Sequence, residues 1–539
     1  MRRKLLLWIA PWIALGLGAC ATAPRVGTSE PCAEWRWIAI RGAEESKCPD
    51  DVPGWKVEPL FPTPPVAEAR TADYKGEKVP SAAPTPAPEV LDQLERFCVY
   101  ETHERAGKLP PPPTANGKLV RVDRDCAAVS VSGNTAWHPF SDRFMEQAGK
   151  PDTALDIQNV RGVRLAFLDT QPTGEPFPTR PTDEWASEHG YTLAHMARNL
   201  ICSPDDGARC AALITTRMAL PIQQWDSRSW RGTKISPERG GQIGTQLDLA
   251  RAIREEVDAW RKDLGRPDAP QHLVLNLSVG WDGRLFSGFQ EQAAEMNAGT
   301  QAVYWALRYA RDLDVLVLAA AGNACNGPSE GPLLPAAWEQ EAPEEGTCGE
   351  PAERPLVYAV GGVDRWGRAL MNTRRGGMPG RAAYGEDGVV PALFAPGDST
   401  NMYTGTSVST AIVASIAAIV WDTLPDRSSR QIMEILHRSG NNLSAIHADL
   451  RASFWFGAGM AGRSTPPPVR RLSLCSALAE ACREPGALNC PLRSECDPWV
   501  PDPSAPQARL SAPPLRTCHP WVHTQPPTEP CPVCEPPRN

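Results

Sequence analysis

Short apolar, β-branched runs alternate with amphipathic stretches over residues 155–463. Such runs are typical of buried strands, whereas apolar residues three and four positions apart are typical of helices. The predicted strands span residues 163–168, 211–219, 272–277, 315–320, 356–360 and 389–394. The predicted helices span residues 189–200, 246–264, 300–312, 407–423 and 429–437. This alternation predicts a mostly parallel sheet with helices on both faces and reactive groups at the carboxyl ends of its strands.

The chain begins with the basic sequence MRRK, followed by an apolar run that is too short to be a convincing membrane span. Residues 1–19 are therefore predicted to be a secretion signal peptide. The run ends in Leu17-Gly18-Ala19-Cys20, which resembles the lipobox of bacterial lipoproteins. We expect Cys20 to carry a lipid that anchors the protein to the bacterial cell envelope. Ala21, in place of Asp, favours the outer membrane in a Gram-negative source.

Two segments separate this signal from the alternating region. Residues 20–88 are rich in Pro, Ala and charge and show no sustained period, so they predict a Pro-rich tether. Residues 89–154 form an N-terminal segment with a helical pattern at 89–104 and a strand pattern at 119–131. This segment is either a propeptide or an arm packed on the next domain.

Residues 464–539 set seven cysteines among many prolines and predict a disulfide-stapled C-terminal extension outside the alternating region. Cutting the chain after about Arg463 is therefore expected to leave the chemistry of that region intact. Cysteine and histidine are ligands that zinc accepts, and the tail holds both, at Cys518, His519, His523, Cys531 and Cys534. In an exported chain, disulfides and two incidental histidines are the favoured interpretation.

The 16 cysteines are typical of an oxidising compartment. Without Cys20 their number is odd, so at least one thiol is free or paired outside the chain, unless a metal holds it. Neighbours along the chain suggest four pairs: Cys32 with Cys48, Cys98 with Cys126, Cys202 with Cys210, and Cys325 with Cys348. The formal net charge of −8 argues against nucleic acid as a partner.

A carboxylate and an imidazole stand near the start of the alternating region. An apolar run ends abruptly in Asp169, and a buried Asp at such a place can orient a histidine and stabilise its protonated form. A strand-end Asp alone more often caps a turn. His189 opens a helical pattern and is followed by Gly190, which permits another segment to approach closely. His195 lies on a different helical face and is interpreted as a packing or surface residue.

An amide and a hydroxyl follow further along the chain. The run VLVLAAAG precedes Asn323, whose side-chain NH₂ can donate to an oxyanion, although an isolated Gly-Asn usually marks a turn. The sequence GTS ends at Ser407 and leads into an apolar helix. Ser407 is either the helix N-cap or a nucleophile whose own backbone N–H helps to bind an oxyanion. Ser409 and Thr410 are interpreted as packing hydroxyls.

The chain order Asp169, His189, Asn323, Ser407 resembles that of the subtilisin-like serine peptidases. The resemblance covers residues 155–445 and includes LNLSVG at 275–280, VYAVGGVD at 357–364 and FAPG at 394–397. It implies a three-layer α/β/α domain with Ser407 as nucleophile and His189, oriented by Asp169, as general base. Asn323 and the Ser407 amide would stabilise the oxyanion, and the reaction would need no cofactor.

The resemblance also implies a place for a protein or peptide substrate. Its backbone would pair with the edge formed by Ser278, Val279 and Gly280, as an added strand. Small residues at Ala320 and Gly322 would leave room for a substrate side chain. An acidic loop at 338–350 could favour basic substrates, but a solvated charged loop is the favoured interpretation.

The chain departs from the family pattern after three of these residues. The usual DTG or DSG is DTQ at 169–171, HGT is HGY at 189–191, and the MATP that follows the nucleophile is VSTA at 408–411. None of these changes removes a group that transfers a proton, attacks a carbonyl or donates to an oxyanion. The short interval between the Asp and the His indicates that loops which often bind calcium are missing, so no metal is predicted.

The sequence thus predicts a monomeric serine endopeptidase that forms an acyl-enzyme. One alternative is an inactive envelope lipoprotein that uses a peptidase-like fold to bind peptides or proteins. Another is an esterase of the α/β-hydrolase kind. That is disfavoured because the sequence GTSVS around Ser407 lacks the second Gly of a nucleophile elbow and because the His precedes the Ser.

Overall fold

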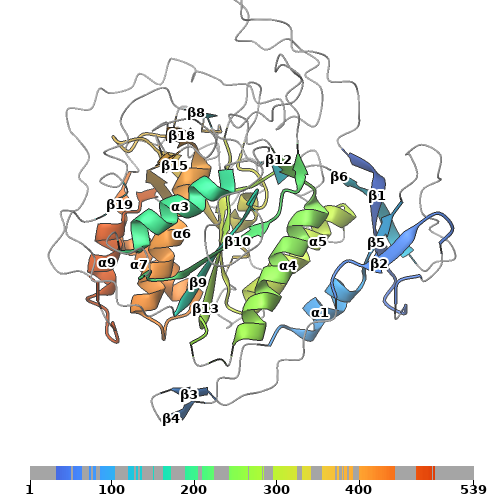
Figure 1. Cartoon of the computed structure of the whole chain (residues 1–539), viewed down its shortest axis with the longest axis horizontal. Helices are drawn as coiled ribbons and strands as arrows, with labels where there is room; N and C mark the ends of the chain where they lie inside the picture. The colour runs from blue at the N-terminus through green and yellow to red at the C-terminus, as the bar shows by residue number, and fades with distance from the viewer. Residues whose placement is uncertain are drawn as a thin grey trace, which may run out of the picture.

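The structure is a computed structural model of the 539-residue chain (Figure 1). It describes, with short internal gaps, residues 32–62, 72–79, 85–102, 119–135, 148–150, 162–171, 189–223, 242–283, 295–323, 331–340, 355–391, 400–443 and 469–491. The predicted signal peptide with Cys20, most of the acidic loop, the proposed pair Cys325 and Cys348, and the Cys and His residues after 491 lie outside these ranges.

An eight-stranded sheet forms the centre of the molecule, in the order β10-β9-β13-β14-β15-β16-β20-β19. All neighbours are parallel except β19 and β20, so the predicted mostly parallel sheet is confirmed. Five of its strands match predicted ones: β9 (Val163–Asp169), β10 (Leu213–Met218), β13 (His272–Leu277), β14 (Leu316–Ala320) and β15 (Tyr358–Val363). The other three are β16 (Arg381–Tyr384), β19 (Asn441–Asn442) and β20 (Arg470–Arg471).

Helices cover both faces of this sheet and give the three-layer α/β/α arrangement (Figure 1). One face carries α4 (Gln246–Asp263) and α5 (Ala298–Asp312). The other carries α3 (His189–Ile201), α6 (Thr406–Thr423), α7 (Ser429–Ser439) and α9 (Leu474–Ala481). Each face of the sheet has its own hydrophobic core. Alternate residues of a strand belong to the two cores, because successive side chains point to opposite faces. Leu273 and Leu275 of β13 pack with α4 and α5, and Val274 packs with α3 and α6.

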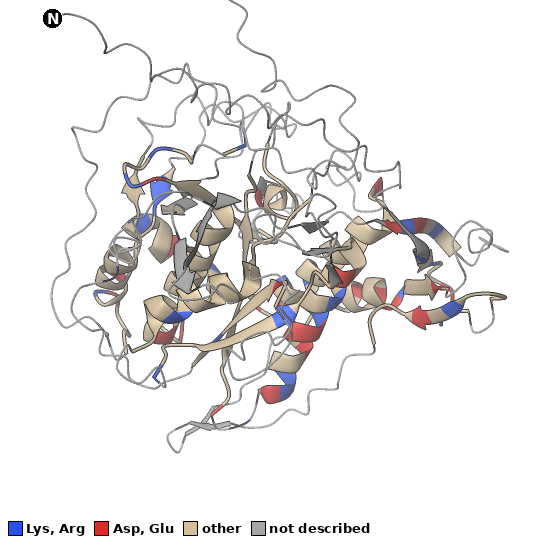
Figure 2. Ribbon diagram, turned by 45° about the horizontal axis from the view of Figure 1, so that its top comes forward, with Lys and Arg blue, Asp and Glu red and all other residues tan. Residues whose placement is uncertain are grey.

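The central helix α6 is apolar on all sides. Within the described part of the chain it is the one helix with the length and hydropathy of a membrane span, and 94% of it is buried inside the fold. It packs against β9, β13, β14 and β15 and against α3, so its composition is explained by a place in the core. Figure 2 shows the contrast with α4, along which charged residues are spread.

The predicted strand at 389–394 does not join the parallel sheet. The structure has β17 (Gly388–Pro391) there, paired antiparallel with β18 (Thr400–Thr404). β18 in turn pairs with β8 (Asn134–Thr135) in a separate three-stranded sheet. The connection from β17 to β18 is too short for the crossover that parallel neighbours require, so the chain turns back on itself. The other small sheets are β11 (Ile222–Gln223), β12 (Gln242–Gly244) and β7 (Val129–Ser130), and β3 (Ala72–Tyr74) with β4 (Glu77–Val79).

A second folded unit lies in the region predicted to be a tether. β1 (Cys32–Arg41), β2 (Lys56–Pro59), β5 (Phe97–Glu101) and β6 (Leu119–Cys126) form an antiparallel sheet in the order β2-β5-β1-β6. With α1 (Pro88–Glu95), we call them the N-terminal unit. The tether prediction is therefore wrong for β1 and β2. The helix predicted at 89–104 ends at Glu95, because the aromatic and β-branched residues of FCVY suit a strand.

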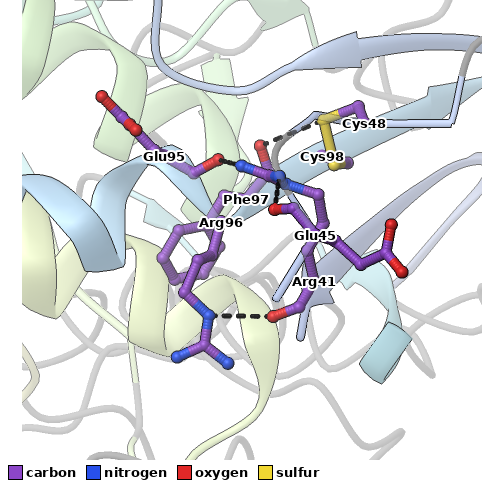
Figure 3. Close-up of a disulfide and its surroundings, with 7 residues drawn as sticks. All are labelled: Arg41, Glu45, Cys48, Glu95, Arg96, Phe97 and Cys98. Atoms are coloured by element: carbon purple, nitrogen blue, oxygen red, sulfur yellow. Dashed lines mark hydrogen bonds between the residues drawn. A yellow bond between two sulfur atoms is a disulfide. The ribbon is translucent and has the colours of Figure 1, made fainter. Parts of the chain in front are cut away.

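Two disulfide predictions within the N-terminal unit are also wrong. Cys48 bonds to Cys98, not to Cys32, and the Cα atoms of Cys32 and Cys126 lie opposite each other in β1 and β6. Figure 3 shows the surroundings of the Cys48–Cys98 disulfide, where the Arg41 guanidinium donates to the backbone carbonyls of Glu45 and Glu95. Pairing across the sheet brings together cysteines that are distant in sequence. The predicted disulfide between Cys202 and Cys210 is confirmed.

The N-terminal unit packs on α4 and α5 (Figure 1). Ile38 and Ile40 of β1 and Phe97 and Val99 of β5 belong to the same hydrophobic core as these two helices. This unit is thus part of the folded body.

The domain built on the eight-stranded sheet extends beyond the predicted boundary at Arg463. β20 pairs in parallel with β16, and α9 packs against α6 and α7 with Leu474 and Leu478 fully buried. A disulfide between Cys482 and Cys490 follows directly. The prediction that residues after 463 form an external tail is wrong up to at least Cys490. One more strand and one more helix of the domain lie there, in a segment whose cysteines and prolines are atypical of regular structure.

Candidate active site

The candidate site lies where the strand order of the parallel sheet changes direction. From β9 the chain moves outward to β10, and then returns to place β13 on the other side of β9. In open α/β sheets, the crevice at the carboxyl ends of the strands flanking this switch point is the usual site for ligands. Asp169 is the last residue of β9, and Ser278 follows β13 directly.

Asp169 and His189 form a buried pair. The imidazole Nδ1 of His189 lies 2.8 Å and 3.0 Å from the two carboxylate oxygens of Asp169. His189 is 1% exposed and Asp169 is 0% exposed. The backbone N–H of Thr170 also donates to Asp169 (2.7 Å). A carboxylate held in this way fixes the orientation of the imidazole.

Gly190 makes this pairing sterically possible. A Cβ at position 190 would lie only 2.9 Å from the Cβ of Asp169 and from the backbone nitrogen of Gln171. The Gly190 N–H donates to the hydroxyl of Thr170 (3.0 Å). The close approach expected from the His-Gly sequence is thus present between the start of α3 and the end of β9.

Ser407 stands in the first turn of α6, after Gly405 as N-cap, so the alternative in which Ser407 is itself the N-cap is wrong. Its hydroxyl donates to the backbone carbonyl of Ser278 (3.3 Å). Among the described residues, the backbone N–H of Ser407 has no hydrogen-bond acceptor. First-turn amides are left unpaired by the helix itself, so this N–H is available to a developing negative charge.

Asn323 lies beside the start of α6. Its Oδ1 accepts hydrogen bonds from the backbone N–H (3.0 Å) and the hydroxyl (3.3 Å) of Thr406, the residue before Ser407. Thr406 in turn accepts from the Gly322 N–H (3.1 Å). This fixes which end of the Asn323 amide is the oxygen and leaves the NH₂ as its donor end. A Cβ at Gly405 would lie 2.7 Å from the Nδ2 of Asn323. The glycine therefore allows the start of α6 to approach the segment that carries Asn323.

Thr406 was not predicted as a site residue. The only sequence signal was its place next to Ser407, because its contact with Asn323 joins residues 83 positions apart. Asn276 was not predicted either. Its side chain contacts Ser278, only two positions away, but Ser278 reaches Ser407 across 129 positions.

The segment predicted to bind substrate has a clear position. The carbonyl of Ser278 faces Ser407, Val279 is buried, and Trp281 exchanges two backbone hydrogen bonds with Leu334, each 2.9 Å. The Leu333 side chain lies against Gly322, one of the small residues expected to leave room for a substrate side chain. A Cβ at Gly322 would come within 2.5 Å of the Leu333 side chain, and one at Gly280 within 3.0 Å.

Two other predictions concern groups around the site. His195 is partly buried and its ring packs against Tyr191, with ring centroids 5.6 Å apart. Burial, with the nearby Arg198 charge, lowers the pKa of His195. In the part of the chain that the structure covers, no group of three or more His, Cys, Asp or Glu side chains is arranged to hold a metal ion.

These groups suit one kind of chemistry. A hydroxyl at a helix start, a histidine oriented by a buried carboxylate, and an amide beside the hydroxyl are the parts needed for nucleophilic acyl transfer. Together with the parallel α/β sheet, they are typical of a serine hydrolase.

Comparison with known proteins narrows this class. The family model described as "Subtilase family" matches residues 232–459, which include Asn323 and Ser407 and begin after Asp169 and His189. Mycosin-1 of Mycolicibacterium smegmatis is 25% identical over 364 residues, which are 61% of this chain and 74% of mycosin-1. Subtilisin DY of Bacillus licheniformis is 28% identical over 172 residues, which are 30% of this chain and half of that protein. Over the residues matched, the chain is similar to the subtilase family of serine peptidases.

Solved structures of three subtilase-related proteins are also similar. A mutant of the protease domain of PatA is 22% identical, with a TM-score of 0.36, and the match covers 60% of this chain and 97% of that one. The prenylagaramide maturation protease PagA is 18% identical, with a TM-score of 0.37, and the match covers 64% of this chain and 99% of PagA. A chain of the subtilase cytotoxin SubAB is 17% identical, with a TM-score of 0.40, and the match covers 63% of this chain and 96% of that one.

Proposed function

We propose that this protein is a serine endopeptidase in which Asp169, His189 and Ser407 form the catalytic triad. The observation that carries the proposal is the buried hydrogen bond between His189 and Asp169, at the same end of the sheet at which Ser407 begins α6. The contact between Ser407 and Ser278, which follows the strand next to β9, supports a common site.

The proposed mechanism uses only groups already described. His189, oriented by Asp169, takes the hydroxyl proton of Ser407 as its oxygen attacks the peptide carbonyl. The amide of Asn323 and the backbone N–H of Ser407 donate to the resulting oxyanion. His189 then gives the proton to the leaving amine, and a water molecule deprotonated by His189 hydrolyses the acyl-enzyme.

The position of Leu333 suggests a substrate preference. With the substrate backbone along Ser278, Val279 and Gly280, the side chain of the residue whose carbonyl is attacked would point toward Gly322 and Ala320. Leu333 fills the space between Gly280 and Gly322. We therefore propose that this substrate side chain is small.

A fluorophosphonate probe tests the proposed chemistry, because it reacts with an activated serine. The wild-type chain should be labelled and should digest casein, whereas Ser407→Ala should do neither. Ser415→Ala is a matched control, since Ser415 is a buried α6 hydroxyl whose bond among the described residues is within its own helix (2.7 Å to the Ala411 carbonyl).

The two alternatives predict different results in the same assays. A folded wild-type chain that neither reacts nor digests casein would support the inactive peptide-binding lipoprotein. A chain that reacts and cleaves simple esters, but no peptide bond, would support the esterase.

We further propose that the peptidase is held at the cell envelope by a lipid on Cys20. The basis is the short apolar run that ends in Leu17-Gly18-Ala19-Cys20. Only a thiol can form the thioether, so Cys20→Ser should abolish palmitate incorporation and release the protein from membranes. Ser407→Ala should incorporate palmitate normally. Palmitate uptake by Cys20→Ser would contradict the anchor.

A further inference from the structure

A chain of three buried side chains leads from the middle of the sheet to Ser407. The Nδ2 of Asn276, in β13, donates to the hydroxyl of Ser278 (3.0 Å). That hydroxyl donates to the backbone carbonyl of Ser407 (3.1 Å), and the Ser407 hydroxyl donates back to the carbonyl of Ser278 (3.3 Å). Residues Asn276, Ser278 and Ser407 are all buried.

The direction of these bonds is determined by Asn276. A serine hydroxyl has one hydrogen and can donate only once. Because Asn276 donates to Ser278, the Ser278 hydroxyl is left to use its own hydrogen toward Ser407. The Ser278 side chain thus holds Ser407 by its backbone carbonyl and restricts the first turn of α6, on which the nucleophile stands.

Asn276 is a polar residue at a position where it lowers the stability of the fold. It is fully buried in the parallel sheet, opposite Phe167 of β9 and Leu318 of β14. Among the described residues, its Oδ1 has no hydrogen-bond partner. A buried polar atom without a partner lowers stability, and an apolar residue of similar size would avoid this penalty. The only described partner of the Asn276 side chain is the hydroxyl that leads to Ser407.

We infer that Asn276 and Ser278 are positioning residues for the nucleophile, with Asn276 acting through Ser278. The inference rests on the proposed function and adds a role for two side chains to it, beyond the backbone role of Ser278 in substrate binding. Its physical basis is the sensitivity of attack to geometry, because a displacement of about 1 Å can lower the rate roughly 100-fold.

Two substitutions test this role. Ser278→Ala removes the hydroxyl and keeps the backbone, and Asn276→Leu removes the amide and keeps its approximate volume. Each should lower kcat on a peptide substrate by roughly 10- to 100-fold with little change in KM. Asn276→Leu should leave Tm unchanged or raise it, since it removes an unpaired buried oxygen. Ser415→Ala, a buried hydroxyl elsewhere in α6, should leave kcat unchanged.

The double variant gives a readout that a merely structural role would not produce. Because Asn276 acts through Ser278, adding Asn276→Leu to Ser278→Ala should lower kcat no further than Ser278→Ala alone. Two independent structural defects would instead multiply their effects on kcat and lower Tm together.

The possible failures are distinguishable. An active wild-type enzyme whose Ser278→Ala variant keeps wild-type kcat, or whose two substitutions multiply, would overturn this inference and leave the proposed function intact. A folded wild-type chain without peptidase activity or probe labelling would overturn the proposed function, and this inference with it.

Discussion

Single residues around Ser407 are held by contacts between backbone and side chain. Asn323 shows this well, because both hydrogen bonds to its Oδ1 come from Thr406, one residue before Ser407. A rotation of the amide would lose both bonds. The donor end of Asn323 is thus fixed relative to the attacking hydroxyl before any substrate binds, which is the condition for preorganised stabilisation of an oxyanion.

Asn323→Ala should therefore lower kcat while KM stays nearly unchanged, because an amide there does little for a neutral carbonyl and much for the anion formed on attack. The expected loss is roughly 10²–10³-fold, which is the size of the effect when the oxyanion-hole donor is removed from subtilisin, a related enzyme. Steady-state kinetics on a peptide substrate measures it. A folded variant with wild-type kcat, or with only a raised KM, would contradict the assignment.

Between elements, the junction of the N-terminal unit with the catalytic domain is organised by β6. Asp123 accepts the backbone N–H of Ala298, the first residue of α5 (2.7 Å). Asp125 is fully buried and pairs with Arg36, which also donates to Asp248 in the first turn of α4 (2.9 Å). One carboxylate of β6 thus meets the positive end of the α5 dipole, and the other is linked to the start of α4 through Arg36.

This junction makes stability depend on pH. Burial raises the pKa of Asp125 to about 7, opposed by the Arg36 charge and reinforced by the Asp248 carboxylate. A raised pKa means that the folded state binds this proton more tightly than the unfolded state. The contribution to stability is therefore greatest below the unfolded pKa near 4 and is lost as pH rises through about 7.

Asp125→Asn, which is neutral at every pH, removes this dependence. Relative to wild type, the variant should gain stability as pH rises from about 4 to about 7, by at most about 1.4 kcal/mol per pH unit, and the difference should then level off. Denaturant unfolding across this range measures both proteins under the same conditions. A difference that is constant with pH, or that falls as pH rises, would contradict the role of Asp125.

In the whole molecule, the catalytic domain is completed by residues that follow the predicted boundary. Arg471 of β20 donates to the backbone carbonyls of Asp364 (3.3 Å) and Arg365 (3.2 Å). Leu472, Leu474 and Leu478 are buried in the core that also contains α6, the helix that carries Ser407. The C-terminal elements therefore support the site without contributing a group to it.

A chain that ends at Arg463 should be much less stable than one that ends at Val500, which keeps β20, α9 and the Cys482–Cys490 disulfide. Each of the three buried leucines contributes about 1.5–3 kcal/mol, so their loss is comparable with the roughly 5–15 kcal/mol that holds a typical domain together. Thermal unfolding and soluble yield measure the difference. Equal Tm for the two chains would show that these residues are dispensable.

The sequence by itself determined the central parallel sheet and most of its helices, and it marked Asp169, His189, Asn323 and Ser407 as the candidate site. Periodicity and strand-end motifs are local signals, and each of these residues stands at the end of a strand or the start of a helix that such signals reveal.

Only the tertiary structure decided which flanking segments belong to the fold and which residues support the site. The strands β2 and β20 are short and lie next to prolines, and they, like β1, are paired with partners far along the chain. The same holds for the Cys48–Cys98 disulfide, whose cysteines are 50 residues apart, and for Ser278 and Ser407, which are 129 apart. Such contacts leave no trace in a local pattern, because their energy comes from pairing across the sheet.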